Sequence, residues 1–169
     1  GIVSLQGHVE FYVDEAGGQS LEQVQQALFE DPGDEDLKTK PNDQTWVRFT
    51  LHNGGPDPVE AMVHLGIESL DVAFFYLVGE GFDPQPTSLG ETVPAFQTPL
   101  SVSYPQLPVP LAAGGSVQVY LKAQDWRPRA LPLRVGPLAD LQGEAKRNFF
   151  MNGYTNGISA LYLMLGVML

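Results

Sequence analysis

Five side chains of this sequence have the types and the spacing to recognise a small ligand. A tryptophan, an arginine and a histidine occupy alternate positions of one predicted strand: Trp46, Arg48 and His52. Alternate residues of a strand point to the same face, so these three would share a surface. Trp126 and Arg127 repeat the pairing of ring and guanidinium late in the chain. Because flat rings and forked cations suit sugars and carboxylates, we predict a ligand site on these residues.

A second interpretation of the strand with Trp46 stays open. In it, Trp46 covers the second face of a sheet, and Arg48 pairs with a nearby acid. The ring and the guanidinium would then stabilise the fold instead of meeting a ligand. The sequence alone leaves both interpretations in place.

Four carboxylates lie close together in an acidic loop: Asp31, Asp34, Glu35 and Asp36. Calcium prefers such hard oxygen ligands, and Gly33 allows the tight turn that calcium loops use. The order of residues is not that of an EF-hand, because the bidentate Glu at the twelfth position is missing. The mutual repulsion of the four carboxylates must be reduced, either by a bound cation or by exposure to solvent. We therefore predict either a calcium site, with calcium as the only cofactor, or a solvated acidic loop.

The sequence argues against most enzyme and nucleic-acid functions. Its three histidines, His8, His52 and His64, lack metal-ligand spacing, and there is no nucleophile elbow, phosphate loop or dinucleotide fingerprint. Cysteine is absent, which removes disulfides, thiolate metal sites and cysteine nucleophiles. A formal net charge of -11 repels nucleic-acid phosphates. We predict a domain that is not an enzyme; a hydrolase, for which no pair of acids is singled out, is the third-ranked function.

Alternation of apolar and polar residues predicts about eight strands, with one short helix near the N-terminus. Ser20 and Gln23 form a capping box, which predicts a helix from Leu21 to Phe29. One polar face per strand favours antiparallel sheets, so the predicted class is all-β, a jelly-roll β-sandwich. The clearest strands are His8–Asp14, Thr45–Asn53, Val59–Leu65, Leu70–Val78, Ser116–Ala123 and Leu131–Val135, with edge pieces in Glu91–Tyr104.

The composition changes near residue 140, which divides the chain into a domain of residues 1–140 and a segment of residues 141–169. No charged residue follows Arg147, and the run from Ile158 to Leu169 is almost purely apolar. We predict a C-terminal apolar helix that begins a first membrane span, although a span needs about 20 apolar residues. A helix buried in the domain is the alternative. Lys146 and Arg147 before the run are the observation against a span that starts outside the cell.

The order of these features resembles a known family. The segments that carry the resemblance are Trp46–Asn53, Leu70–Tyr76, Gly90–Glu91, Pro94–Phe96, Val117–Lys122 and Asn152–Tyr154. Together they are similar to the type 2 extracellular domain of bacterial seven-transmembrane receptors with diverse intracellular signalling modules. The family often has an arginine shortly after its Pro-Phe pair, whereas Gln97 and Thr98 follow Phe96 here. No ligand-binding role is therefore carried over to that position.

The resemblance implies a jelly roll akin to carbohydrate-binding modules, in the periplasm, on a bacterial inner-membrane receptor. It implies that membrane spans connect the domain to a cytoplasmic histidine kinase or cyclic-dinucleotide enzyme. We expect a sensor that binds a carbohydrate-like ligand or calcium and biases the membrane helices, to which the C-terminal segment joins it. The alternative is an interaction domain without a small ligand, which pairs with a second copy or another receptor's outer domain. Nucleic acid is not an expected partner.

Overall fold

Two packed sheets form the body of the protein. A computed structural model describes residues 3–4, 8–33, 36–66, 70–88 and 106–137. The described elements are β1 (Val3–Ser4), β2 (Glu10–Asp14), α1 (Leu21–Val24), β3 (Gln44–His52), β4 (Val59–Leu65), β5 (Val72–Val78), β6 (Thr87–Ser88), β7 (Gln106–Leu111), β8 (Ser116–Gln124) and β9 (Leu133–Gly136).

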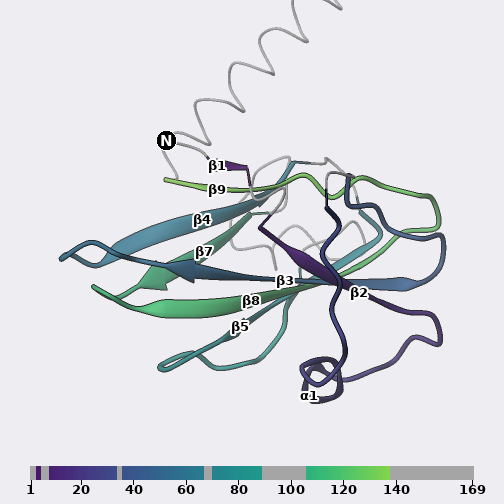
Figure 1. Cartoon of the computed structure of the whole chain (residues 1–169), viewed down its shortest axis with the longest axis horizontal. Coiled ribbons are helices and arrows are strands. Elements are labelled where there is room, and N and C mark those ends of the chain that lie inside the picture. The colour runs from purple at the N-terminus through teal and green to yellow at the C-terminus, as the bar shows by residue number, and fades with distance from the viewer. Residues whose placement is uncertain (1–2, 5–7, 34–35, 67–69, 89–105, 138–169) are drawn as a thin grey trace, which may run out of the picture.

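The described strands pair antiparallel and divide between the two layers seen in Figure 1. One sheet has the order β1-β9-β4-β7 and the other has the order β2-β3-β8-β5-β6. Consecutive strands lie in different sheets at six points: β1 to β2, β3 to β4, β4 to β5, β6 to β7, β7 to β8 and β8 to β9. The predicted sandwich of antiparallel sheets is thereby confirmed.

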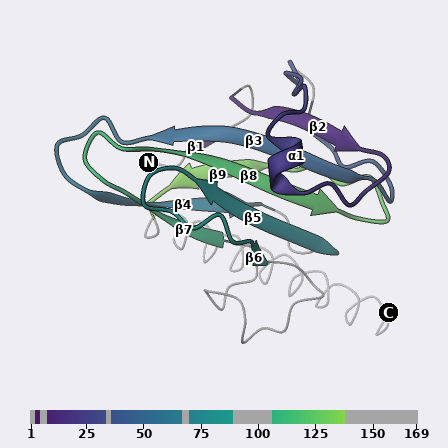
Figure 2. The same cartoon turned by 90° about the horizontal axis from the view of Figure 1, so that it is seen from below.

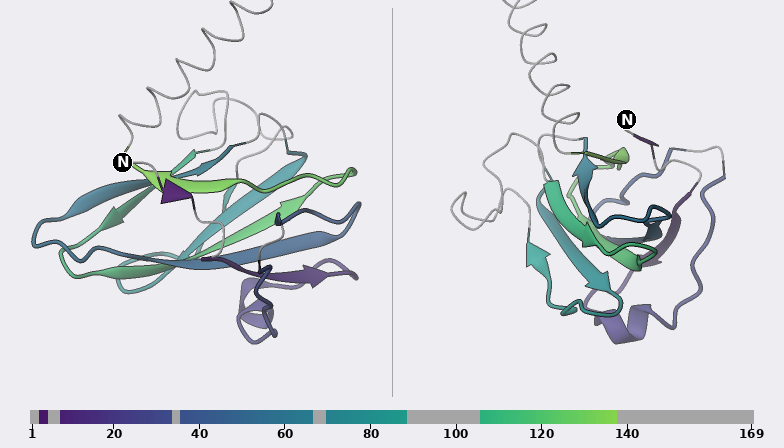
Figure 3. Two further views of the ribbon diagram at one scale, coloured as in Figure 1. Left: turned by 45° about the horizontal axis from the view of Figure 1, so that its top comes forward. Right: turned by 90° about the vertical axis from the view of Figure 1, so that its left-hand side faces the viewer.

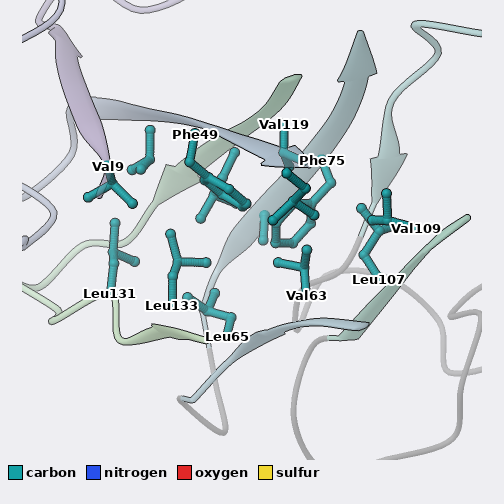
Figure 4. Packing of buried hydrophobic residues seen from close by; sticks show 14 of the residues in the cluster. Val9, Phe49, Val63, Leu65, Phe75, Leu107, Val109, Val119, Leu131 and Leu133 are labelled. Carbon is teal, nitrogen blue, oxygen red and sulfur yellow. The ribbon is translucent and has the colours of Figure 1, made fainter. Parts of the chain in front are cut away.

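The core lies between the sheets and follows from the alternation read in the sequence. In β3 the buried residues Val47, Phe49 and Leu51 alternate with more exposed positions. Their cross-strand partners on β8 include Leu121 and Val119, which are fully buried. Figure 4 shows Phe49 and Val119 on the side of the core opposite Val63 and Leu65 of the other sheet. Burial of many aliphatic and aromatic side chains between two faces is the main force that holds such a sandwich together.

A second, smaller apolar cluster covers the outer face of the five-stranded sheet. It contains Leu21 and Val24 of α1, Phe29 after it, and Trp46 and Tyr120 of the sheet. Figures 2 and 3 show α1 on this outer side, away from the four-stranded sheet. The sheet therefore buries apolar residues on both of its faces near α1.

The helix is shorter than the sequence predicted. The capping box is present, because the Ser20 side chain accepts from Gln23 N and the Gln23 side chain bonds back to Ser20 N. However, α1 ends at Val24 rather than Phe29. Glu30 forms backbone hydrogen bonds with Phe11 in both directions, each of 2.8 Å. The chain must leave the helix early to reach this edge of β2, and Leu28, which follows the helix, is 84% exposed.

Strand β7 was not predicted because it contains Pro108 and Pro110, and proline lacks the N–H that a ladder needs. Among the described strands it pairs only with β4, at the edge of the sheet that these strands form. Residues two apart in a strand direct their N–H positions the same way, so both missing donors can face the open edge. Proline is tolerated at such edges.

Two predicted regions lie outside the described residues: the edge pieces of Glu91–Tyr104 and the whole segment of residues 141–169 with its apolar helix. Within the part of the chain that the structure describes, no helix has the length and apolar character needed to cross a membrane.

Candidate functional site

The five residues predicted to bind a ligand do not meet at one place. His52 ends β3 and pairs with Ser116 at the start of β8, whereas Trp126 follows the other end of β8, which lies beside the start of β3. Gln44 and His52 are eight positions apart in β3, and at roughly 3.4 Å per residue this is about 27 Å. The candidates therefore divide into separate environments.

Trp46 is fully buried, with a side chain that no solvent reaches. It lies beneath α1 and its ring contacts that of Tyr76, with ring centroids 5.5 Å apart at 30°. The ammonium of Lys122, its cross-strand neighbour, lies 5.4 Å from the ring centroid. Among the residues that the structure describes, none provides a hydrogen-bond partner for the indole Nε1. In this arrangement Trp46 covers the second face of the sheet, as the alternative interpretation predicted.

Arg48 is occupied by partners within the domain. Its Nε donates to the carboxylate of Glu10, which lies directly opposite on β2. Its guanidinium also lies over the ring of Phe29, 4.2 Å from the centroid. The hydrogen bond with Glu10 raises the pKa of Arg48, so the cation persists at any physiological pH. This too matches the alternative interpretation, in which Arg48 pairs with a nearby acid.

His52 is exposed, and its Nδ1 lies 2.8 Å from the hydroxyl of Ser116. The two residues are cross-strand partners, so the contact follows directly from the register of β3 and β8. This pair lies far from both tryptophans.

Trp126 and Arg127 form the most accessible of the predicted groups. Trp126 is 62% exposed, and the Arg127 guanidinium carbon lies 4.4 Å from the centroid of its ring. Stacking of a cation on one face leaves the indole with an ordered position. The backbone N–H of Trp126 donates to the Asp71 carboxylate, 3.1 Å away. An aromatic ring held open to solvent in this way is a suitable binding surface.

A buried carboxylate supports this loop from below. Asp125 is only 1% exposed, and it accepts a hydrogen bond of 2.8 Å from the backbone N–H of Arg127. The same carboxylate lies 3.7 Å from Arg127 Nε and 3.4 Å from Arg129 Nε. One acid thus holds two guanidinium groups, and the loop retains a cationic surface.

The loop of residues 36–43 closes the other side of this site, which the sequence did not predict. The Thr39 hydroxyl donates to the carbonyl of Arg127 at 3.1 Å and accepts from Arg129 N at 2.9 Å. In the same region, Lys38 and Ala130 form an isolated antiparallel β-bridge between their backbones. Thr39 is distant in sequence and belongs to no motif, so the sequence analysis found only Trp126 and Arg127 of this site. We call Thr39, Asp125, Trp126, Arg127 and Arg129 the Trp126 site.

The acidic loop is described only in part. The Asp31 carboxylate accepts from the backbone N–H of Gly33 at 2.8 Å, and Asp36 is exposed. Asp34 and Glu35 lie outside the described residues, so the predicted calcium site stays a prediction. Among the residues that the structure does describe, no group of three or more potential metal ligands comes together.

Comparison with known proteins identifies the family. No curated protein matches the chain. A family model described as 7TMR-DISM extracellular 2 matches residues 6–136, which is more than half of the 169 residues. The match spans the described sandwich from before β2 to the last residue of β9. The chain therefore belongs to the 7TMR-DISM extracellular 2 family, whose members are extracellular sensor domains, not themselves catalytic, of seven-transmembrane receptors with diverse intracellular modules.

Proposed function

We propose that this domain senses a carbohydrate-like ligand at the Trp126 site. The observation that carries the proposal is the exposed Trp126 ring, 62% accessible, with Arg127 and Arg129 held beside it by the buried Asp125. Holding an aromatic residue in the open loses the free energy of burying it. A ligand that stacks on the free face of the ring would recover that free energy.

The chemistry of the site favours a sugar that carries an acidic group. The free face of Trp126 offers apolar contact to the C–H groups of a sugar ring. The guanidinium of Arg127 offers a forked pair of donors to a carboxylate. Lys38 and Lys40 on the neighbouring loop are exposed and add positive charge, although the chain as a whole carries a net charge of -11. The site is therefore a place where an acidic ligand can approach an acidic protein.

We further propose that the two sheets form a jelly roll in the periplasm, as the domain of a bacterial inner-membrane receptor. Alternation of the chain between two antiparallel sheets supports that topology. The receptor would end in a histidine kinase or a cyclic-dinucleotide enzyme. The ligand would act by binding one of two receptor states more tightly than the other, since equal affinity for both shifts nothing.

Calorimetry against neutral and acidic oligosaccharides tests the proposal. We expect binding of an acidic oligosaccharide, loss of binding in Trp126→Ala, and strong weakening in Arg127→Gln. Leu28→Ala is a matched control, because Leu28 is also an exposed large apolar residue but lies outside the Trp126 site. Binding that is unchanged in Trp126→Ala would show that this surface does not recognise the ligand.

Calcium at Asp31, Asp34, Glu35 and Asp36 remains a second proposed ligand. The argument for it is the mutual repulsion of four neighbouring carboxylates, which a divalent cation relieves. A calcium titration followed by thermal unfolding tests it, with magnesium as the control cation. Equal unfolding temperatures with and without calcium would remove this ligand from the proposal.

The second candidate function is protein interaction without a small ligand. The specific observation in its favour is Leu28, a large apolar side chain that is 84% exposed just after α1. Light scattering on the chain and on Leu28→Asp distinguishes the two functions. A dimer that Leu28→Asp dissociates would favour the interaction domain, whereas a monomer in both cases would favour the ligand sensor.

A further inference from the structure

A strap crosses the outer face of the five-stranded sheet and hides an aromatic surface. The strap consists of residues 17–33, and it includes α1. Figures 1 and 2 show α1 lying over this face of the sheet. Beneath it are Trp46 of β3, Tyr76 of β5 and Tyr120 of β8, which we call the covered face. Three neighbouring strands therefore each contribute one aromatic ring.

The covered face has the composition of a binding surface. Trp46 and Tyr76 lie with ring centroids 5.5 Å apart, and Tyr120 is adjacent to Tyr76 across the strands. The cations of Arg48 and Lys122 flank the rings on the same face. Glu10 neutralises Arg48, and Glu22 of the strap is the acid that acts electrostatically on Tyr76. A row of rings bordered by donors fits the apolar face and hydroxyl rim of a sugar.

The indole N–H of Trp46 is the observation that points to a ligand. The side chain is fully buried, and its Nε1 has no hydrogen-bond partner within the described part of the chain. A buried donor without an acceptor is unfavourable, and native proteins rarely keep one without a reason. The strap supplies apolar contact to this ring but supplies no acceptor. A sugar in the place of the strap would supply apolar contact through its C–H groups and an acceptor through a hydroxyl or ring oxygen.

The attachment of the strap suits reversible opening. Its helix is one turn long, and its buried contacts with the sheet are made by Leu21, Val24 and Phe29. Glycines with positive φ lie near its two ends, Gly18 at 90° and Gly33 at 63°. Such positions allow the chain to change direction without steric penalty. Short segments with few buried contacts open at lower free energy than the core of a domain.

We propose that the covered face is a second carbohydrate site, and that the strap occupies it until the ligand displaces it. The inference rests on the proposed ligand-sensing function but uses residues other than the Trp126 site. The apparent affinity of such a site is its intrinsic affinity reduced by the fraction of molecules with the strap open. Changes to the strap must therefore alter binding even when they lie away from the covered face.

The first test uses the two tryptophans as separate reporters. In Trp126→Phe, Trp46 is the remaining tryptophan, since the chain has two. Fluorescence titration of this variant with neutral and acidic oligosaccharides should change Trp46 emission. Adding Leu21→Ala, which loosens the strap, should tighten apparent binding about tenfold. Leu28→Ala on the same strap is the matched control and should leave binding unchanged, because Leu28 is 84% exposed.

The second test fastens the strap. The backbone hydrogen bonds between Phe11 and Glu30 place these residues about 5.5 Å apart at Cα, which a disulfide spans. The chain has no cysteine, so Phe11→Cys with Glu30→Cys introduces two cysteines that can form a disulfide only with each other. In the Trp126→Phe background, the oxidised form should bind at least about tenfold more weakly than the reduced form. The reduced form controls for the substitutions themselves.

The outcomes separate this inference from the proposed function. Binding that changes with Leu21→Ala and with the disulfide supports the strap. A different result would overturn the strap proposal and keep the Trp126 site. In that result the wild type binds, Trp126→Ala does not bind, the emission of Trp46 does not change, and the oxidised and reduced disulfide variants have equal affinity. An absence of any effect of oligosaccharides on Trp46, in the loosened variant as well, also overturns the strap.

Discussion

The two tryptophans of this chain have the same chemistry but opposite environments. Each has a cation over its ring: Lys122 at 5.4 Å from Trp46, and Arg127 at 4.4 Å from Trp126. Trp46 is fully buried beneath the strap, whereas Trp126 is 62% exposed in a loop. The difference shows that a cation stacked on an aromatic ring does not by itself identify an accessible surface. What covers the ring decides whether it stabilises the fold or faces a ligand.

The two regions also differ in what holds them. The Trp46 region is held by apolar contact between the strap and the sheet. The Trp126 site is held by hydrogen bonds and ion pairs that converge on Asp125 and Thr39. Apolar burial scales with area and tolerates small movements, whereas hydrogen bonds depend on geometry. Substitutions in the two regions should therefore differ in size and in kind.

The largest expected effect is on stability, and it separates the two rings. Trp46→Ala should reduce the free energy of unfolding by about 3–5 kcal/mol, because it empties a packed site beneath the strap. Trp126→Ala should change it by no more than about 0.5 kcal/mol, since the ring is exposed. Urea unfolding followed by circular dichroism measures both. Equal losses in the two variants would break the comparison.

The next effect concerns the support of the exposed ring. Asp125→Ala should reduce the free energy of unfolding by about 1–3 kcal/mol, because it removes the buried carboxylate that a partly buried N–H and two guanidinium groups share. Asp57→Ala, at an exposed aspartate, is the control and should have an effect within about 0.5 kcal/mol. Urea unfolding again provides the measurement. If Asp125→Ala behaved like the control, the loop would not depend on this carboxylate.

A smaller effect tests the start of the strap. Ser20→Ala removes the capping box of α1 and should reduce the free energy of unfolding by about 1 kcal/mol. Ser20→Thr keeps a hydroxyl and should retain most of the stability. In Trp126→Phe, acrylamide quenching of Trp46 should rise with Ser20→Ala and not with Ser20→Thr. Unchanged quenching would show that the cap does not hold the strap over Trp46.

The smallest effect is a pH dependence on the buried side of the comparison. Burial, with a contribution from the charge of Glu22, raises the pKa of Tyr76 above its ordinary value of 10.0. The unfolded chain therefore loses this proton at lower pH than the folded domain does. Stability from this group is complete below about pH 10 and falls as pH rises through the folded pKa. Urea unfolding as a function of pH should show a shallower alkaline loss in Tyr76→Phe than in the wild type; parallel profiles would contradict the assignment.

Much of the fold followed from local pattern. The alternation of Val47, Phe49 and Leu51 predicted β3 and its buried face, and the Ser20–Gln23 capping box predicted where α1 begins. These features depend on neighbours in sequence, which is why they were visible. The end of α1 was not, because it depends on Glu30 pairing with Phe11 on a distant strand. Strand β7 was missed because its prolines are acceptable only at a sheet edge.

The candidate site could be predicted only in part. Trp126 and Arg127 were singled out as adjacent residues with complementary chemistry, and the structure stacks them. Thr39 could not be found, because its contacts with Arg127 and Arg129 span 88 and 90 residues. Trp46, Arg48 and His52 share a strand face as predicted, but Trp46 lies beneath the strap and Arg48 is paired with Glu10.

The amino-acid order alone determined strands β2, β3, β4, β5, β8 and β9, their buried faces, the absence of cysteine chemistry and the family to which the chain belongs. Those properties arise from alternation and composition, which act between near neighbours along the chain. Only the packing of the strap on the five-stranded sheet decided that Trp46 is hidden and Trp126 is open. The physical reason is that solvent exposure is set by segments distant in sequence, and a side chain's type does not reveal what will lie on top of it.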